Sequence, residues 1–164
     1  NYGRPSYYLT AQICLNGHTI THMYEESPER AAPHCDKCGD STITQCPDCD
    51  ENIRGYHRTP GVAVLGGWAA PAFCHSCGTA YPWTVAKLRE AKDFADQVEE
   101  LTPEERTELR VSVDHLVRDT PGAETAIMKV GRLMDKAGPR ISGLFQNILA
   151  GVVTEVAKKG IWGG

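Results

Sequence analysis

The sequence has no cysteine beyond Cys77, so all seven cysteines of the 164-residue chain lie in its first half. It also has no uninterrupted apolar run of about 18 residues, the length that would indicate a membrane-spanning helix. The first residues, N-Y-G-R-P-S-Y-Y, lack the basic and then apolar layout of a secretion signal. We therefore expect a cytoplasmic protein without a membrane partner.

An excess of basic charge is also missing. The formal net charge is −4, and it becomes more negative if seven thiolates hold two Zn2+ ions. Residues 1–84 carry five Lys and Arg against eight Asp and Glu, and residues 85–164 carry twelve against thirteen. A protein that binds nucleic acid normally presents a basic stripe to the phosphates. We therefore expect no nucleic-acid partner.

Six of the cysteines form three C-x2-C pairs, which are Cys35/Cys38, Cys46/Cys49 and Cys74/Cys77. A disulfide framework would have an even cysteine count and a secreted context, so this pattern indicates metal binding. Zinc takes four ligands in a tetrahedron, and one short knuckle of this kind supplies two thiolates from a single turn.

Two zinc sites need eight ligands, and the three pairs supply six of them. Cys14 is the seventh, and His18, which follows the turn-forming Asn16-Gly17, is the eighth. The predicted ligand set is Cys14, His18, Cys35, Cys38, Cys46, Cys49, Cys74 and Cys77. Four protein ligands saturate each ion, so we predict two structural Zn2+ ions per chain and no catalytic zinc.

The order in which the pairs share ions stays open. In a sequential arrangement, Cys14, His18, Cys35 and Cys38 hold one ion, and the other four cysteines hold the second. In a cross-braced arrangement like that of a RING, Cys14/His18 would share one ion with Cys46/Cys49, and Cys35/Cys38 would share the other with Cys74/Cys77. The seven residues between Cys38 and Cys46 favour the sequential arrangement of tandem ribbons.

No catalytic constellation accompanies these cysteines. The sequence has no G-x-S-x-G, H-E-x-x-H or phosphate-binding glycine loop. His22, His57 and His115 have no nucleophile or carboxylate at a telling spacing. His34 and His75 lie beside ligating cysteines and could substitute for them, but we expect each to be a solvent-facing knuckle residue. We therefore predict that the protein is not an enzyme. Trp68, Tyr81 and Trp83 flank the last knuckle, and we expect these rings to pack there rather than stack on a base.

The two halves differ in pattern, and together they predict an α+β fold. Residues 1–84 read as a tandem zinc-ribbon domain, with strands expected at Tyr7–Ile13, Thr42–Thr44 and Gly61–Trp68. Residues 85–164 have helical periodicity and read as a four-helix bundle for oligomerisation. Thr102-Pro103-Glu104-Glu105 is a helix start with a capping box.

The last predicted helix runs from about Pro139 to Lys159, with Gly160 as its C-terminal cap. It has no charged residue from Ile141 to Thr154, so it needs an apolar partner. That partner is the centre of its own bundle, a second copy of the chain or, with least support, a membrane surface. The second alternative predicts a homo-oligomer formed through Ile141 to Val156.

Four segments resemble a bacterial family of unknown function that has an N-terminal tandem zinc ribbon. They are A-Q-I-C-L-N-G-H-T-I-T (11–21), C-D-K-C-G-D-S-T-I-T-Q-C-P-D-C (35–49), N-I-R-G-Y (52–56) and F-C-H-S-C-G-T-A-Y-P-W-T (73–84). The resemblance implies two zinc sites with the eight ligands named above, and it implies no activity. In the helical half, D-T-P-G-A-E-T-A (119–126) and V-A-K-K-G-I-W-G (156–163) are loosely similar to tails of small bacterial proteins associated with phage defence.

The sequence thus predicts a non-enzymatic zinc-binding adaptor or scaffold. Its ribbons would recognise a protein partner and its helices would self-associate, in a context of bacterial phage defence. One alternative is a nucleic-acid-binding zinc ribbon that uses Arg4, Arg54, Arg58 and the aromatic rings. Another alternative is a cross-braced, RING-like adaptor of a transferase reaction.

Overall fold

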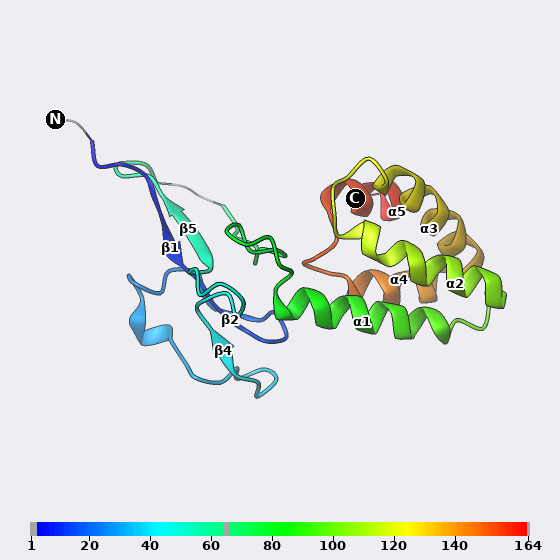
Figure 1. The fold of residues 1–164 in the computed structure, drawn as a ribbon, viewed down its shortest axis with the longest axis horizontal. Coiled ribbons are helices and arrows are strands. Elements are labelled where there is room, and N and C mark those ends of the chain that lie inside the picture. Colours follow the sequence, from blue (N-terminus) through cyan, green and yellow to red (C-terminus); the bar gives the residue numbers. More distant parts are fainter. Residues whose placement is uncertain (1–2, 64–65, 164) are drawn as a thin grey trace. The chain divides into compact units, whose positions relative to one another are not determined.

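The computed structural model describes residues 3–63 and 66–163. By its internal contacts the chain divides into two compact units, Asn1–Thr84 and Val85–Gly164. The first unit contains short strands and loops, and the second consists of helices (Figure 1). The fold is therefore α+β, as the sequence predicts.

The strands of the first unit form two small antiparallel sheets. In one sheet, β1 (Tyr7–Thr10) pairs with β5 (Arg54–Arg58). In the other, the order is β3 (Thr19–Thr21), β2 (Gln12–Cys14) and β4 (Thr42–Ile43). A short 3-10 helix, Pro28–Arg30, lies in the long connection between β3 and β4.

Two of the predicted strands differ in extent from those in the structure. Tyr7–Ile13 forms β1 and β2, which belong to different sheets, because the chain leaves one sheet at Ala11 and enters the other. The Ala11 N–H donates to the carbonyl of Ile53 at this point. Thr44 lies just beyond β4, and its carbonyl accepts from the Ile53 N–H at 2.9 Å.

The predicted strand at Gly61–Trp68 is wrong for the part that the structure describes, since residues 61–63 and 66–68 contain no strand. Residues 64 and 65 lie outside the described residues. Gly61 has a φ of +78°, and the Val62 N–H donates back to the Thr59 carbonyl, so this segment turns instead of extending. Sequence reasoning missed two strands, β3 (Thr19–Thr21) and β5. β3 has only three residues, and β5 contains two arginines and one glycine and has no apolar alternation.

The core of the first unit is small. Apart from the cysteines, its buried apolar side chains are Leu9, Ala11, Ile13, Ile53, Tyr81 and Trp83. Gly55 allows β5 to approach the preceding loop, because a Cβ atom at this position would lie 2.3 Å from the carbonyl oxygen of His22.

Five α-helices make up most of the second unit, and the first of them begins in the last residues of the first unit. They are α1 (Pro82–Asp96), α2 (Pro103–Ser112), α3 (Ala123–Ala137), α4 (Pro139–Ile148) and α5 (Glu155–Trp162), and a 3-10 turn, Val113–Leu116, follows α2. The capping box predicted at Thr102 is confirmed, because its hydroxyl accepts from the Glu105 N–H and the Glu105 carboxylate accepts from the Thr102 N–H.

The single last helix predicted from Pro139 to Lys159 is wrong, because the chain forms α4 and α5 with a turn between them. Gly151 in that turn has a φ of +84°, and Thr154 starts α5 by accepting from the Ala157 N–H. Gly160 is not a cap; it lies inside α5, and Gly163 at φ +76° ends the helix.

The apolar stripe of this last region is mostly covered within its own unit. Ile141, Phe145, Leu149 and Val152 are buried. Leu144 of α4 and Val156 of α5 are 41% and 52% exposed. The predicted homo-oligomer through Ile141 to Val156 therefore has few exposed apolar side chains available to it and stays a prediction.

None of the helices in the described part of the chain has the length and the apolar character needed to cross a membrane.

Candidate metal centres

The three C-x2-C pairs fold into the same local structure. In each knuckle the N–H of the first cysteine donates to a carbonyl five residues later, at 2.8 to 2.9 Å. An isolated antiparallel bridge then closes each knuckle, and these bridges are His34↔Ser41, Gln45↔Asn52 and Phe73↔Ala80. Every knuckle therefore presents its two sulfur atoms from one tight turn, which is the geometry that half a zinc site needs.

The residue after the second cysteine has a left-handed backbone in all three knuckles. Gly39 and Gly78 occupy this position at φ +78° and +76°, and Asp50 occupies it at φ +62°. Glycine adopts this conformation without strain, and aspartate is among the few other residues that tolerate it. The C-P-D-C-D segment thus forms the same turn without the glycine that marks the other two in the sequence.

The structure brings Cys14, His18, Cys35 and Cys38 together as the first cluster. The Nδ1 atom of His18 lies 3.4 Å from the Cys14 sulfur and 3.5 Å from the Cys35 sulfur. The Cys14 and Cys38 sulfurs are 3.7 Å apart. The loop that positions His18 closes on itself, since the Cys14 N–H donates to the His18 carbonyl and Gly17 turns at φ +93°.

The other four cysteines, Cys46, Cys49, Cys74 and Cys77, form the second cluster. The Cys46 and Cys77 sulfurs are 3.7 Å apart, and the Cys49 and Cys74 sulfurs are 3.6 Å apart. In both clusters the ligand atoms all lie within 4.8 Å of one another. All seven cysteines are free, so the sulfur atoms are close without being bonded.

These spacings fit tetrahedral zinc. Sulfur atoms bound about 2.3 Å from one zinc ion lie about 3.8 Å apart at the corners of a regular tetrahedron. The sulfur pairs above, at 3.6 to 3.7 Å, are close to that value. Three thiolates with one imidazole, and four thiolates, are both donor sets of structural zinc sites, and each would leave no position for a substrate or water.

The grouping of the ligands follows the order of the sequence. Cys14/His18 and Cys35/Cys38 form one cluster, and Cys46/Cys49 and Cys74/Cys77 form the other. A cross-braced arrangement would join Cys14/His18 to Cys46/Cys49, but these two pairs lie in different clusters. The sequential prediction therefore agrees with the structure, and the RING-like alternative loses its geometric basis.

Backbone and side-chain donors surround the sulfur atoms and stabilise their thiolate form. The N–H groups of His18, Lys37 and Ser76 point at sulfur atoms from 3.3 to 3.4 Å. The Asn16 side-chain amide donates to the Cys38 sulfur at 3.3 Å and lowers the pKa of that thiol to about 6. Hydrogen bonding from the Cys77 backbone likewise lowers the pKa of Cys74 to about 6.

Burial acts in the opposite direction on the first cysteine of each cluster. Desolvation raises the pKa of Cys14 and of Cys46, because a buried thiolate loses its hydration. Within each of the three knuckles the first cysteine is buried and the second is exposed. A bound cation would compensate for the loss of hydration at the buried positions.

The rings beside the second cluster pack as the sequence predicts. Tyr81 and Trp83 stack with their centroids 4.6 Å apart, and both are 1% exposed. The Trp83 Nε1–H donates to the Pro71 carbonyl. Burial raises the pKa of Tyr81, whose hydroxyl oxygen has no hydrogen-bond partner in the described part of the chain. Trp68 lies elsewhere and stacks on His22, with the two rings 5.4 Å apart.

The five other histidines join neither cluster. Asn16 is the residue near the sites that sequence reasoning did not identify as more than a turn former. Its position two residues after Cys14 and two before His18 was the available signal, because a polar side chain inside a ligand loop commonly bonds to a ligand.

Two clusters of four ligands and a separate helical unit define an α+β protein with two candidate structural zinc centres. A family model described as an uncharacterized protein conserved in bacteria (DUF2321) matches residues 7–161, and the chain belongs to this family. No curated protein and no solved structure matches the chain.

Proposed function

We propose that this protein is a non-enzymatic zinc-binding scaffold. Two structural Zn2+ ions stabilise the first unit, which recognises a protein partner, and the second unit joins copies of the chain. One observation supports this most directly: each cluster supplies four ligands, and such a donor set saturates zinc without leaving a reactive position. A reducing cytoplasm would keep the seven thiols free for the metal.

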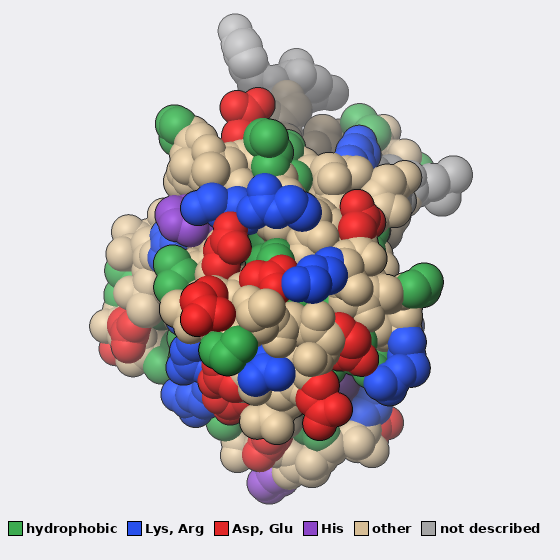
Figure 2. Space-filling model, turned by 90° about the vertical axis from the view of Figure 1, so that its right-hand side faces the viewer, with side chains coloured by type: hydrophobic (Ala, Val, Ile, Leu, Met, Phe, Trp, Pro, Cys, Tyr) green, Lys and Arg blue, Asp and Glu red, His purple; other side chains and the backbone are tan. Residues whose placement is uncertain are grey.

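Surface charge supports a protein partner over nucleic acid. On the face seen in Figure 2, Lys and Arg side chains lie among Asp and Glu side chains. Ion pairs also neutralise several cations of the helical unit, as Asp96 does for Arg110 and Glu108 for Arg132. Binding to phosphates needs cations that are not already neutralised. A role in phage defence stays a prediction that rests on the loose likeness of residues 119–126 and 156–163.

The metal content tests the foundation of this proposal. We expect two zinc ions per chain by elemental analysis of the intact protein. His18→Ala should lose or weaken one zinc ion and leave the second in place, because His18 belongs to the first cluster alone. A chain that folds without any bound metal would contradict the proposal.

Self-association has its own test. Leu144 and Val156 are the exposed apolar residues of α4 and α5, and Met128 of α3 is 75% exposed. We expect the intact chain to run as an oligomer in size-exclusion chromatography with light scattering. Replacing Leu144 and Val156 together by Gln should give a monomer, whereas the control Met128→Gln should leave the mass unchanged. A monomeric intact chain would remove this part of the proposal.

A further inference from the structure

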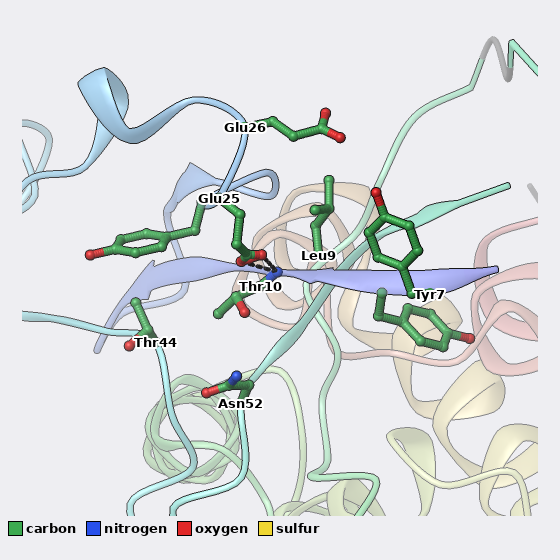
Figure 3. Close-up of a pocket in the computed structure, with 9 residues that line it drawn as sticks. Tyr7, Leu9, Thr10, Glu25, Glu26, Thr44 and Asn52 are labelled. Atoms are coloured by element: carbon green, nitrogen blue, oxygen red, sulfur yellow. Dashed lines mark hydrogen bonds between the residues drawn. The ribbon is translucent and has the colours of Figure 1, made fainter. Parts of the chain in front are cut away.

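The first unit contains a groove that neither metal cluster uses. It has a volume of about 580 Å3 and follows β1. Figure 3 shows the side chains that surround it, and we call it the tyrosine groove; it is lined by Tyr7, Tyr8, Leu9, Thr10, Tyr24, Glu25, Glu26, Thr44 and Asn52. A smaller hollow of about 230 Å3 shares Tyr8, Leu9, Thr10 and Asn52 with it and is also lined by Arg54.

Three tyrosine side chains that line this groove are exposed to solvent. Tyr7, Tyr8 and Tyr24 are 47%, 49% and 38% exposed. Tyrosine is enriched where proteins bind one another, because its ring covers a large area and orders few rotatable bonds. An exposed group of this kind indicates a contact surface.

The tyrosines of this unit already accept guanidinium groups. The Arg54 Cζ atom lies 4.4 Å from the centroid of the Tyr8 ring. The Arg58 Cζ atom lies 5.2 Å from the centroid of the Tyr56 ring. Tyr56 lies outside the groove, so Tyr8 is the lining ring that already has a guanidinium over its face.

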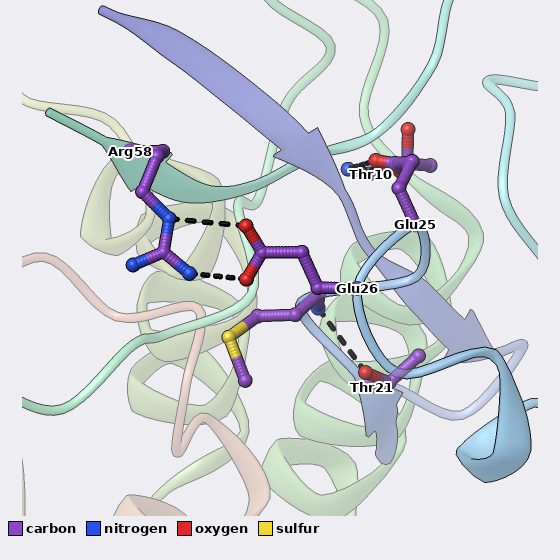
Figure 4. A network of polar contacts seen from close by, with 6 residues as sticks. Thr10, Thr21, Glu25, Glu26 and Arg58 are labelled. Atoms are coloured by element: carbon purple, nitrogen blue, oxygen red, sulfur yellow. Dashed lines mark hydrogen bonds and ion pairs between the residues drawn. The ribbon is translucent and has the colours of Figure 1, made fainter. Parts of the chain in front are cut away.

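A carboxylate in the groove is held in a fixed orientation. Both oxygens of Glu25 accept from the Thr10 N–H, at 2.7 and 2.9 Å. Its neighbour Glu26 forms an ion pair with Arg58 instead, with Nε and Nη2 of the guanidinium facing the two carboxylate oxygens (Figure 4). Within the described ranges, no Lys or Arg forms an ion pair with Glu25.

We infer that the tyrosine groove binds an arginine or lysine side chain presented by an extended segment of a partner protein. The ring faces would contact the cation and its aliphatic stem, and the free lone pairs of Glu25 would accept its N–H groups. The inference rests on the proposed function, since it names the surface through which the scaffold recognises its partner.

The charge of the first unit agrees with a basic occupant. Residues 1–84 carry five Lys and Arg against eight Asp and Glu. Loaded zinc clusters add to this negative charge, because four thiolates on one Zn2+ ion leave a net charge of −2 and three leave −1. An acidic segment or a nucleic acid would be repelled by the same surface.

Three fluorescent peptides test the inference on the zinc-loaded full chain. One alternates arginine with threonine, one replaces each arginine by the neutral isostere citrulline, and one replaces it by glutamate. Fluorescence anisotropy should show binding of the arginine peptide, at least tenfold weaker binding of the citrulline peptide and none of the glutamate peptide. In NMR spectra the arginine peptide should shift the amide signals of Tyr8, Tyr24 and Glu25.

Matched variants separate a defined site from general acidity. Glu25→Gln should lower the affinity for the arginine peptide about threefold to tenfold, and Tyr24→Ala should do the same. Glu29→Gln makes the same charge change at an exposed residue outside the groove, and it should leave the affinity unchanged. Zinc content and circular dichroism confirm that each variant is folded. Equal binding of the citrulline peptide, or equal weakening by Glu25→Gln and Glu29→Gln, would overturn the inference.

One further comparison distinguishes this inference from the proposed function. If a partner identified by zinc-dependent binding to the intact chain binds Tyr24→Ala and Glu25→Gln equally well, the groove is not its site, although the scaffold function stands. If the arginine peptide binds in the groove but the zinc-loaded chain has no protein partner, the groove stands and the scaffold function fails.

Discussion

Asn16 connects the loop of the first cluster to its knuckle. Its side-chain amide donates both to the Cys38 sulfur and to the carboxylate of Asp40. Neither bond is to the metal; the first orients the Cys38 sulfur, and the second holds the Asn16 amide in position. Outer groups of this kind hold a ligand in the geometry that the ion requires.

Replacing Asn16 by Ala should weaken the first zinc site selectively. Because the Cys38 thiolate loses its donor, we expect an affinity about tenfold to a hundredfold lower at that site. Competition with a chromophoric chelator would then show one zinc ion leaving early and one leaving as in the unaltered protein. Asn147→Ala in α4 is the matched control and should leave the affinity of both zinc sites unchanged. Release of both ions at the unaltered rate from the Asn16 variant would contradict the assignment.

Among the elements, α5 depends on a glycine in a helical position. Gly160 lies inside α5, where a Cβ atom would be 2.5 Å from Cγ2 of Ile127 on α3. Ile127 is buried and branched at Cβ, so it cannot move aside without repacking. This close approach explains why a poor helix former occupies the middle of the helix.

Gly160→Ala should therefore destabilise the protein by about 1 to 3 kcal/mol through overpacking. Gly143 in α4 offers the opposite case, because a Cβ atom there meets nothing within 4 Å. Gly143→Ala should stabilise the helix by about 0.5 to 1 kcal/mol, since alanine has less backbone freedom to lose. Urea denaturation followed by circular dichroism measures both changes. A Gly160→Ala variant as stable as Gly143→Ala would exclude close packing as the reason.

At the scale of the whole molecule, the two units derive their stability from different sources. The first unit buries few large apolar side chains, and eight of its residues form the metal clusters. The second unit has a continuous helical core that includes Leu109, Leu116, Val130 and Phe145. Small units with little apolar burial generally need metal or disulfides to fold.

Removing zinc with a strong chelator should unfold the first unit and spare the second. We expect most of the helical circular dichroism to remain while the emission of Trp83, now 1% exposed, shifts to longer wavelength. Restoring zinc should reverse the shift. Loss of the helical signal together with zinc would show that the second unit does not fold on its own core.

The sequence by itself determined which eight residues form the two clusters and where the knuckles give way to helices. Both are local properties: a C-x2-C turn is built by a few adjacent residues, and a capping box such as that at Thr102 spans four. The α+β fold class follows from the same local patterns. The α4 to α5 break was missed because the apolar stripe continues through it, and the reversal at Gly151 depends on how both helices pack.

Only the tertiary structure decided which pairs lie in the same cluster, because spacing permits both arrangements and long-range contacts choose between them. It also decided that Asp50 forms a knuckle turn without glycine. The tyrosine groove is the clearest case. Tyr8, Glu25 and Asn52 are far apart in the sequence, and they meet because β1 pairs with β5 and the loop after β3 returns to Thr10.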